Sequence, residues 1–240
     1  MPNPSAAMLV IGDEILSGRT RDANMHYLAG ELTRAGIDLR EVRVISDDPD
    51  AIVAGVQALS AAYDVVFTSG GIGPTHDDIT AENVAAALDV PIDVRDDARA
   101  LLEAHYQRTG LELNEARLRM ARIPEGAKLI DNPISAAPGF SIGNVHVLAG
   151  VPTIFEAMLA HVLPQIAGGA PVLSQTLQVD RGEGDIAQIL GLLAERYPQL
   201  SIGSYPFQRD GAFGTNVVIR GQDGAAVEAA MADLADQVGA

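Results

Sequence analysis

The alternation of strand-like and helix-like segments over the first two thirds of the chain is the feature that most constrains its fold. Apolar runs that predict buried strands occupy residues 6–12, 37–45 and 63–70, and stretches with apolar residues at helical spacing separate them. Strands and helices in alternation favour a parallel sheet that is covered by helices on both faces. The sequence therefore predicts an α/β domain of three layers with a mostly parallel sheet.

A break in this pattern predicts a second domain. Gly168, Gly169, Ala170 and Pro171 follow the last helical pattern of the first region, and Gly-Gly and Ala-Pro both resist regular structure. Beyond them the pattern is strand, helix, strand, strand, helix, which is typical of a small α+β domain. We therefore predict domains at residues 1–167 and 171–240. Within the first domain, further helical patterns are expected at 80–90, 95–110, 114–123 and 153–166.

Composition and charge narrow the classes of partner. The 240 residues carry a net charge of -16, which repels phosphate backbones and anionic membrane, so neither nucleic acid nor a membrane is expected as the main partner. The chain has no cysteine, which excludes disulfides and thiolate metal sites and suits a reducing cytoplasm. No basic segment with a long apolar run opens the chain, so we expect a cytoplasmic protein.

The stretch TSGGIGPTHDDIT, residues 68–80, places three glycines and two aspartates between a predicted strand and a predicted helix. Gly70, Gly71 and Gly73 allow backbone amides to approach a phosphate closely, and ligands of open α/β sheets bind outside the carboxyl ends of strands. Asp77 and Asp78 would repel that phosphate unless a divalent cation lay between them. The pattern indicates a metal-assisted phosphate site. The alternative is an ordinary tight turn through Pro74 with solvated aspartates.

Two further acidic pairs follow predicted strands. Asp13 and Glu14 come directly after the first strand, and Asp47 and Asp48 come after the second. If the three strands share one parallel sheet, the three acidic pairs lie along one edge. Each pair alone would be read as a solvated loop or a helix N-cap, but together they favour a functional cluster.

These motifs carry a family resemblance. The blocks VIGDEILSGRTRDAN and TSGGIGPTHDDIT, followed by NEARLRMARIPEGA, DNPISAAPGF and VLAGVPTIFEAML, resemble the molybdopterin-binding superfamily of MogA and MoaB. Within it, the chain is most similar to the amino-terminal domain of CinA-like proteins. The resemblance covers residues 6–166 and implies the three-layer fold of that superfamily. It also implies a pterin or a nucleotide as the ligand.

The resemblance assigns site residues position by position. Our own hypothesis assigns Asp13, Asp47 and Asp78 to metal binding or water activation, whereas the resemblance implies that the glycine turn lines the phosphate pocket. The residues that it places at the ligand are Gly12, Gly70, Gly71, Gly73, Pro74, Thr75, His76, Thr80, Asn132, Pro138, Gly139 and Gly150. His76 has two interpretations, a phosphate contact and a solvated loop histidine.

The resemblance implies more than one activity, because fold alone does not choose among them. An acidic site that uses Mg²⁺, Mn²⁺ or Co²⁺ suits metal-dependent cleavage of ADP-ribose, FAD or a related nucleotide diphosphate. One alternative is a non-catalytic carrier or sensor of a pterin or nucleotide, and another is a molybdopterin adenylyltransferase.

The second region is similar in position to the small KH-like region of CinA-like proteins. Its stretch SYPFQRDGAFGTNVVIRG resembles domains linked to FAD synthases, and the acidic RGEGD segment argues against RNA binding. The superfamily also implies a homo-oligomer, either a dimer or a trimer.

Overall fold

The computed structural model describes residues 2–209 and 211–239, and it divides into two compact units, Met1–Gly169 and Ala170–Ala240. Each unit has its own hydrophobic core.

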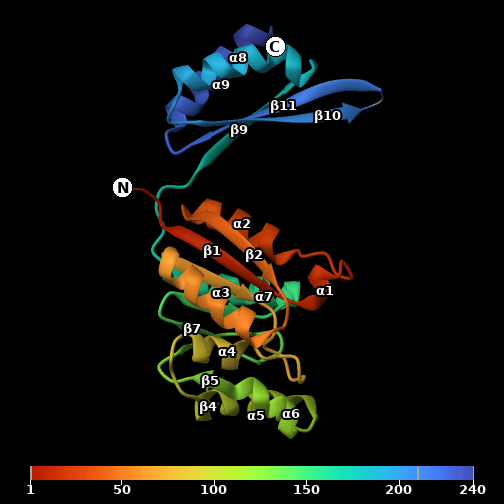
Figure 1. Ribbon diagram of the computed structural model, residues 1–240, viewed down its shortest axis with the longest axis vertical. Helices are drawn as coiled ribbons and strands as arrows, with labels where there is room; N and C mark the ends of the chain where they lie inside the picture. Colours follow the sequence, from red (N-terminus) through yellow and green to blue (C-terminus); the bar gives the residue numbers. More distant parts are fainter. Residues whose placement is uncertain (1, 210, 240) are drawn as a thin grey trace. The chain divides into compact units, whose positions relative to one another are not determined.

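The first unit is built on a six-stranded sheet with the order β2-β1-β3-β8-β7-β6 (Figure 1). The first four strands in that order run parallel, and β7 and β6 continue the sheet antiparallel. The predicted fold class, with its mostly parallel sheet, is confirmed. The strands are β1 (Ser5–Ile11), β2 (Asp38–Ile45), β3 (Val65–Ser69), β6 (Lys128–Ile130), β7 (Gly139–Ile142) and β8 (Val145–Leu148).

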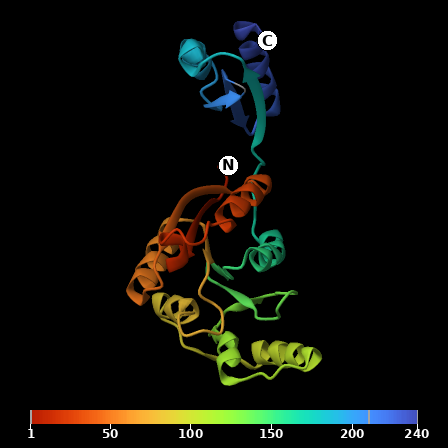
Figure 2. The same cartoon turned by 90° about the vertical axis from the view of Figure 1, so that its right-hand side faces the viewer.

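Helices cover both faces of this sheet (Figure 2). Alternate residues of β1 serve opposite faces: Ala7, Leu9 and Ile11 pack into the core with α3 and α4, and the residues between them pack against α2 and α7. A strand buried on both faces must be apolar throughout, which explains the continuous run from residue 6 to 11. The helices are α1 (Asp13–Leu16), α2 (Asn24–Ala35), α3 (Pro49–Ala62), α4 (Thr80–Ala87), α5 (Asp96–Thr109), α6 (Glu115–Leu118) and α7 (Pro152–Val162), with 3-10 turns η1 (Arg119–Ala121) and η2 (Leu163–Gln165).

The prediction of a helix over residues 114–123 is wrong for the second half of that range. Helix α6 ends at Leu118, the turn η1 follows, and the chain then forms β5 (Arg122–Pro124), which pairs antiparallel with β4 (Ile92–Val94). Pro124 disfavours helical geometry at the residue before it, which is Ile123. In the strand, the side chain of Ile123 is buried in the hydrophobic core. This change of direction places Met120 on the wall of the cleft described below, and it places Arg119 and Arg122 in a smaller pocket beside that cleft.

The second unit has the predicted order of strand, helix, strand, strand, helix. Its antiparallel sheet has the order β10-β11-β9, and one apolar cluster joins the sheet to both helices. Its elements are β9 (Leu173–Val179), α8 (Glu183–Arg196), β10 (Ser201–Arg209), β11 (Ala212–Gly221) and α9 (Gly224–Val238). Within the described residues of the whole chain, no helix combines the length and the apolar character that crossing a membrane requires.

Candidate functional site

A cleft of about 630 Å³ lies at the carboxyl ends of β1 and β3, where the loops that follow the parallel strands meet. Its volume is within the range of small-molecule sites. The predicted site residues that line it are Asp47, Gly70, Gly71, Gly73, Pro74, Asp78, Asn132 and Gly150. Glu14 and Asp77 line it as well, so residues from all three acidic pairs meet at one cavity.

The other predicted site residues lie around the cleft rather than on its wall. Thr80 is fully buried at the start of α4, directly behind Gly71. Gly139 is a structural residue of β7, because a Cβ atom there would meet the carbonyl oxygen of Val147 at 2.4 Å. Pro138 lines a smaller neighbouring pocket. The side chain of His76 is 96% exposed, which agrees with the solvated alternative in this conformation of the loop.

Gly12 and Asp13 support the cleft from the first loop. The backbone amide of Gly12 donates to the carbonyl oxygen of Ile45. The backbone amide of Asp13 donates to a carboxylate oxygen of Asp47 at 2.9 Å, while the Asp13 side chain is itself exposed. Asp13 therefore holds Asp47 in place through its main chain. The neighbouring Asp48 is the N-cap of α3, accepting from the amide of Ala51 at 2.9 Å, so the N-cap alternative holds for this one acid.

The glycine turn needs its glycines for steric reasons. Gly70 has a φ of +108°, and a Cβ atom there would lie 2.1 Å from the carbonyl oxygen of Ile11. Gly71 has a φ of +67°, and its Cβ would lie 2.1 Å from the hydroxyl of Thr80. In the described part of the chain, the amides of Gly71, Ile72 and Gly73 donate to no other group. Three successive unpaired amides on the cleft wall are suited to an anion.

Asp78 shapes the end of this turn. One of its carboxylate oxygens accepts hydrogen bonds from the backbone amide of Thr75 at 2.8 Å and from the Thr75 hydroxyl. The carboxylate also fills the space beside Gly73, where a Cβ atom would lie 2.6 Å from it. Asp78 is thus fixed beside the unpaired amides, with its charge on the cleft wall.

Asp47 is the acid whose titration is most affected by its neighbours. Partial burial raises its pKa, and the negative charges of Asp13, Glu14 and Asp77 raise it further, while the hydrogen bond from the Asp13 amide opposes them. Ionised Asp47 is therefore held at an electrostatic cost. A cation in the cleft would offset that cost.

Sequence reasoning missed Asn24, the first residue of α2. Its side chain is 3% exposed, and its amide group donates to the Ser69 hydroxyl at 2.7 Å and to the carbonyl oxygen of Gly150 at 2.8 Å. Asn24 thereby joins the end of β3 to the loop before α7. Its oxygen has no hydrogen-bond partner in the described part of the chain. The sequence did draw attention to Asn24, because it is the last residue of the block VIGDEILSGRTRDAN. Its role was missed because its hydrogen-bond partners are distant in sequence.

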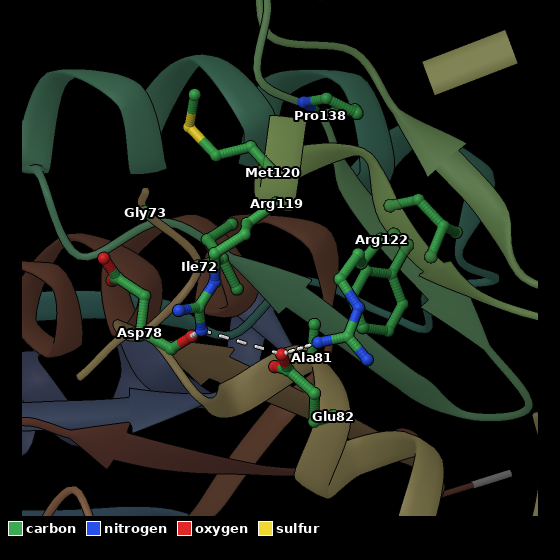
Figure 3. Close-up of a pocket in the computed structure, with 12 residues that line it drawn as sticks. Ile72, Gly73, Asp78, Ala81, Glu82, Arg119, Met120, Arg122 and Pro138 are labelled. Carbon is green, nitrogen blue, oxygen red and sulfur yellow. Dashed lines mark hydrogen bonds and ion pairs between the residues drawn. The ribbon is translucent and has the colours of Figure 1, made fainter. Parts of the chain in front are cut away.

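Two arginines beside the glycine turn were also missed. Figure 3 shows the guanidinium of Arg119 between Asp78 and Glu82. Arg119 donates to the carbonyl oxygen of Asp78 at 3.4 Å and lies 3.7 Å from the Glu82 carboxylate, while Arg122 pairs closely with the same carboxylate. Two arginines share the one carboxylate of Glu82, so positive charge lies beside Asp78 and the glycine turn.

The cleft does not contain a complete protein cage for a metal ion. Among the described residues, no group of three or more histidine or acidic side chains is arranged to hold one. Mg²⁺, however, is commonly bound by one or two carboxylates, with substrate phosphates and waters completing its shell. The hard oxygen donors on the cleft wall fit a cation shared with a phosphate ligand, and they do not fit a cation held by three protein carboxylates.

Comparison with known families matches both units. Residues 7–168 match the family described as "Probable molybdopterin binding domain", and residues 171–240 match the family described as "FAD synthase, middle domain".

Individual relatives agree with these matches. A "Probable FAD synthase" of Caenorhabditis elegans is 34% identical over 254 residues, covering 96% of this chain and 49% of its own length. A "CinA-like protein" of Citrifermentans bemidjiense is 38% identical, covering 68% of this chain and 40% of its own. The crystal structure of CinA from Thermoplasma acidophilum, a protein of unknown function, is 34% identical with a TM-score of 0.62, covering 68% of this chain and 97% of its own. This chain thus spans half or less of the two curated relatives.

Proposed function

The chain belongs to the family of probable molybdopterin binding domains, and from that premise we propose that its first unit is a divalent-cation-dependent pyrophosphatase. Its substrate would be ADP-ribose, FAD or a related nucleotide diphosphate. One observation carries the proposal: the cleft that holds the unpaired amides of the glycine turn also holds Asp47, Asp77 and Asp78. Amides suit a phosphate, and clustered carboxylates beside them suit a cation that neutralises it.

Each group has a task in this proposal. The amides of residues 71–73 bind the diphosphate, and Arg119 adds positive charge beside them. Asp78 keeps the turn in shape, and Asp47 and Asp78 bind the cation, for which Mg²⁺, Mn²⁺ and Co²⁺ are candidates. A bound cation would supply charge neutralisation during in-line attack by water.

Product analysis tests the proposal directly. The purified, metal-stripped protein is incubated with ADP-ribose, FAD or NAD, with Mg²⁺, Mn²⁺ or Co²⁺ added back singly, and the products are separated and identified by mass spectrometry. We expect release of AMP that requires the added cation. Intact substrates under every condition would overturn the proposal.

A non-catalytic carrier or sensor of a pterin or nucleotide is the second candidate. It is favoured by the lack, within the described residues, of three acidic or histidine side chains grouped around one metal position. Tight binding of a nucleotide or pterin in calorimetry, without any turnover, would support this candidate. ATP-dependent adenylylation of molybdopterin would instead support an adenylyltransferase.

The Asp47→Asn variant separates charge from shape at the acidic end of the cleft. Asparagine can still accept from the Asp13 amide, but it removes the charge that its acidic neighbours disfavour. We expect AMP release to fall about 100-fold, and the free energy of unfolding at neutral pH to rise, because the unfavourable charge is removed.

The pH dependence of stability provides the control. The folded-state pKa of Asp47 is raised, so the folded protein binds the proton of Asp47 more tightly than the unfolded chain does. The resulting stabilisation is fully present at pH values below the pKa of an unfolded aspartate, and it is lost as the pH rises through the folded-state pKa. Urea unfolding should be measured for wild type and Asp47→Asn at pH values from below the pKa of an unfolded aspartate to neutral pH. The stability advantage of the variant should grow as the pH rises. A difference independent of pH would contradict the assigned electrostatic cost.

The proposal also includes a homo-oligomer, either a dimer or a trimer. Leu16 and Ile134 are at least half exposed, and each lies within two residues of a residue that lines the cleft. Large exposed apolar side chains near a site are suited to contact with another copy. Sedimentation analysis would decide the state of assembly.

A further inference from the structure

The cleft has an apolar wall that phosphate and cation binding do not explain. Met120, Val151 and Ile154 line it together with Tyr106. Diphosphate binding needs the amides and the charged groups, and a diphosphate gains nothing from these apolar side chains. The part of the ligand that occupies this wall must itself be apolar or flat.

Tyr106 is the residue that indicates what kind of ligand group contacts this wall. It lies in the last turn of α5, is half-buried, and is the only aromatic residue among the described side chains that line the cleft. Aromatic residues make up only 4% of the chain. An aromatic side chain on the wall of a nucleotide-sized cleft is suited to contact with a flat heteroaromatic ring.

The ring of Tyr106 is held in its orientation by neighbours. The guanidinium carbon of Arg117 lies 4.9 Å from the ring centroid, and the ring of His105 meets it edge-on at 5.4 Å between centroids. Arg117 is itself fixed, because its amide donates to the Asn114 side chain and its guanidinium donates to the carbonyl oxygen of Glu112. Arg117 lies over one face of the ring and is not among the residues that line the cleft, so a base that stacks on Tyr106 would use the opposite face.

We propose that Tyr106 is the stacking platform for a flat heteroaromatic ring that the substrate carries at one end of its diphosphate. The ring is of the adenine or flavin type, and Met120 adapts its flexible side chain to the ring's outline. This inference rests on the proposed function for the position of the diphosphate. It adds the group by which the cleft selects its substrate.

The chain contains no tryptophan, so a tryptophan placed at this position reports on the cleft alone. In the Tyr106→Trp variant, stacking of a ring should quench the fluorescence of the new indole in a saturable manner. AMP and FMN are the two probes with rings, and ribose 5-phosphate is the probe without one. Tyr205→Trp is the matched control, because Tyr205 is 53% exposed on β10 of the second unit.

After correction for light absorbed by the probe, we expect AMP or FMN to give saturable quenching of Trp at position 106 and not at position 205, and ribose 5-phosphate to quench neither. The probe that binds more tightly distinguishes adenine from flavin as the ring. Equal quenching of the two variants, or quenching of neither by AMP and FMN, would overturn the inference.

Affinity measured by calorimetry tests the same inference without a fluorophore. Tyr106→Leu should weaken the binding of AMP or FMN about tenfold, and Tyr106→Phe should retain it, because the ring and not the hydroxyl makes the contact. Binding of ribose 5-phosphate should be the same in all three proteins. A folded Leu variant that binds AMP and FMN as tightly as wild type would overturn the inference.

The experiments on Tyr106 can succeed or fail independently of the test of pyrophosphatase activity. Ring-dependent quenching without any AMP release in product analysis would leave Tyr106 as the platform of a binding protein. Metal-dependent AMP release with the same KM in wild type and Tyr106→Leu would keep the pyrophosphatase and reject the platform.

Discussion

Replacing Asp78 with asparagine should lower AMP release at least about 100-fold while leaving the fold intact. The asparagine oxygen can still accept from the amide and hydroxyl of Thr75, so the turn keeps its shape, but the negative charge for the cation is lost. Steady-state kinetics over a series of cation concentrations measures the effect. The loss should be mainly in kcat, with a higher cation concentration needed for half-maximal rate.

Two further variants make this result interpretable. Asp78→Ala removes both the charge and the hydrogen bonds to Thr75, so it should also loosen the turn and weaken nucleotide binding. Asp93→Asn removes an equal charge from an exposed position on β4 and should leave the rate unchanged. If Asp78→Asn retained full activity while Asp78→Ala lost it, Asp78 would be a structural residue of the turn and not a ligand of the cation.

Replacing Gly70 with alanine should lower the free energy of unfolding by about 3 kcal/mol or more. The new Cβ would lie 2.1 Å from the carbonyl oxygen of Ile11, which belongs to β1, and the φ of +108° is itself unfavourable for alanine. Backbone on both sides must shift, because neither partner is the end of a flexible side chain. Urea unfolding followed by circular dichroism measures the loss.

Gly18→Ala is the matched control for backbone conformation. Gly18 has a φ of +72°, but a Cβ atom added there would meet no other atom within 4 Å, so only the conformational cost of about 1–2 kcal/mol applies. Equal losses of unfolding free energy for Gly18→Ala and Gly70→Ala would mean that the backbone moves away from the added Cβ at position 70 without cost. The close approach of Gly70 to Ile11 would then contribute nothing to the architecture of the cleft.

Much of the fold was predictable from local pattern. The fully buried run of β1 and the helical spacing of α2, which ends at Gly36 in a left-handed conformation, are properties of short segments. The parallel order β2-β1-β3 follows from no local pattern, and it is what brings the acidic loops together. The helical pattern failed at residues 119–123, where the following proline and pairing with β4 override helical spacing.

The candidate site was predictable only in part. The glycine turn, Asp47 and Asp78 were identified because they stand in dense local motifs at strand ends. The exposure of the Asp13 side chain, the hydrogen bonds of Asn24 and the position of Tyr106 on the cleft wall were not identified. The partners of Asn24 are 45 and 126 positions away, and no local signal specifies such pairs.

The sequence by itself determined which segments become strands and helices and which loops carry glycine and acid, because those properties follow from side-chain spacing and backbone freedom over a few residues. The tertiary structure alone decided which acids share the cleft and which face solvent. It also decided that Tyr106 borders the cleft beside an arginine. Those outcomes depend on the packing of helices against both faces of the sheet, which brings together residues that lie far apart along the chain.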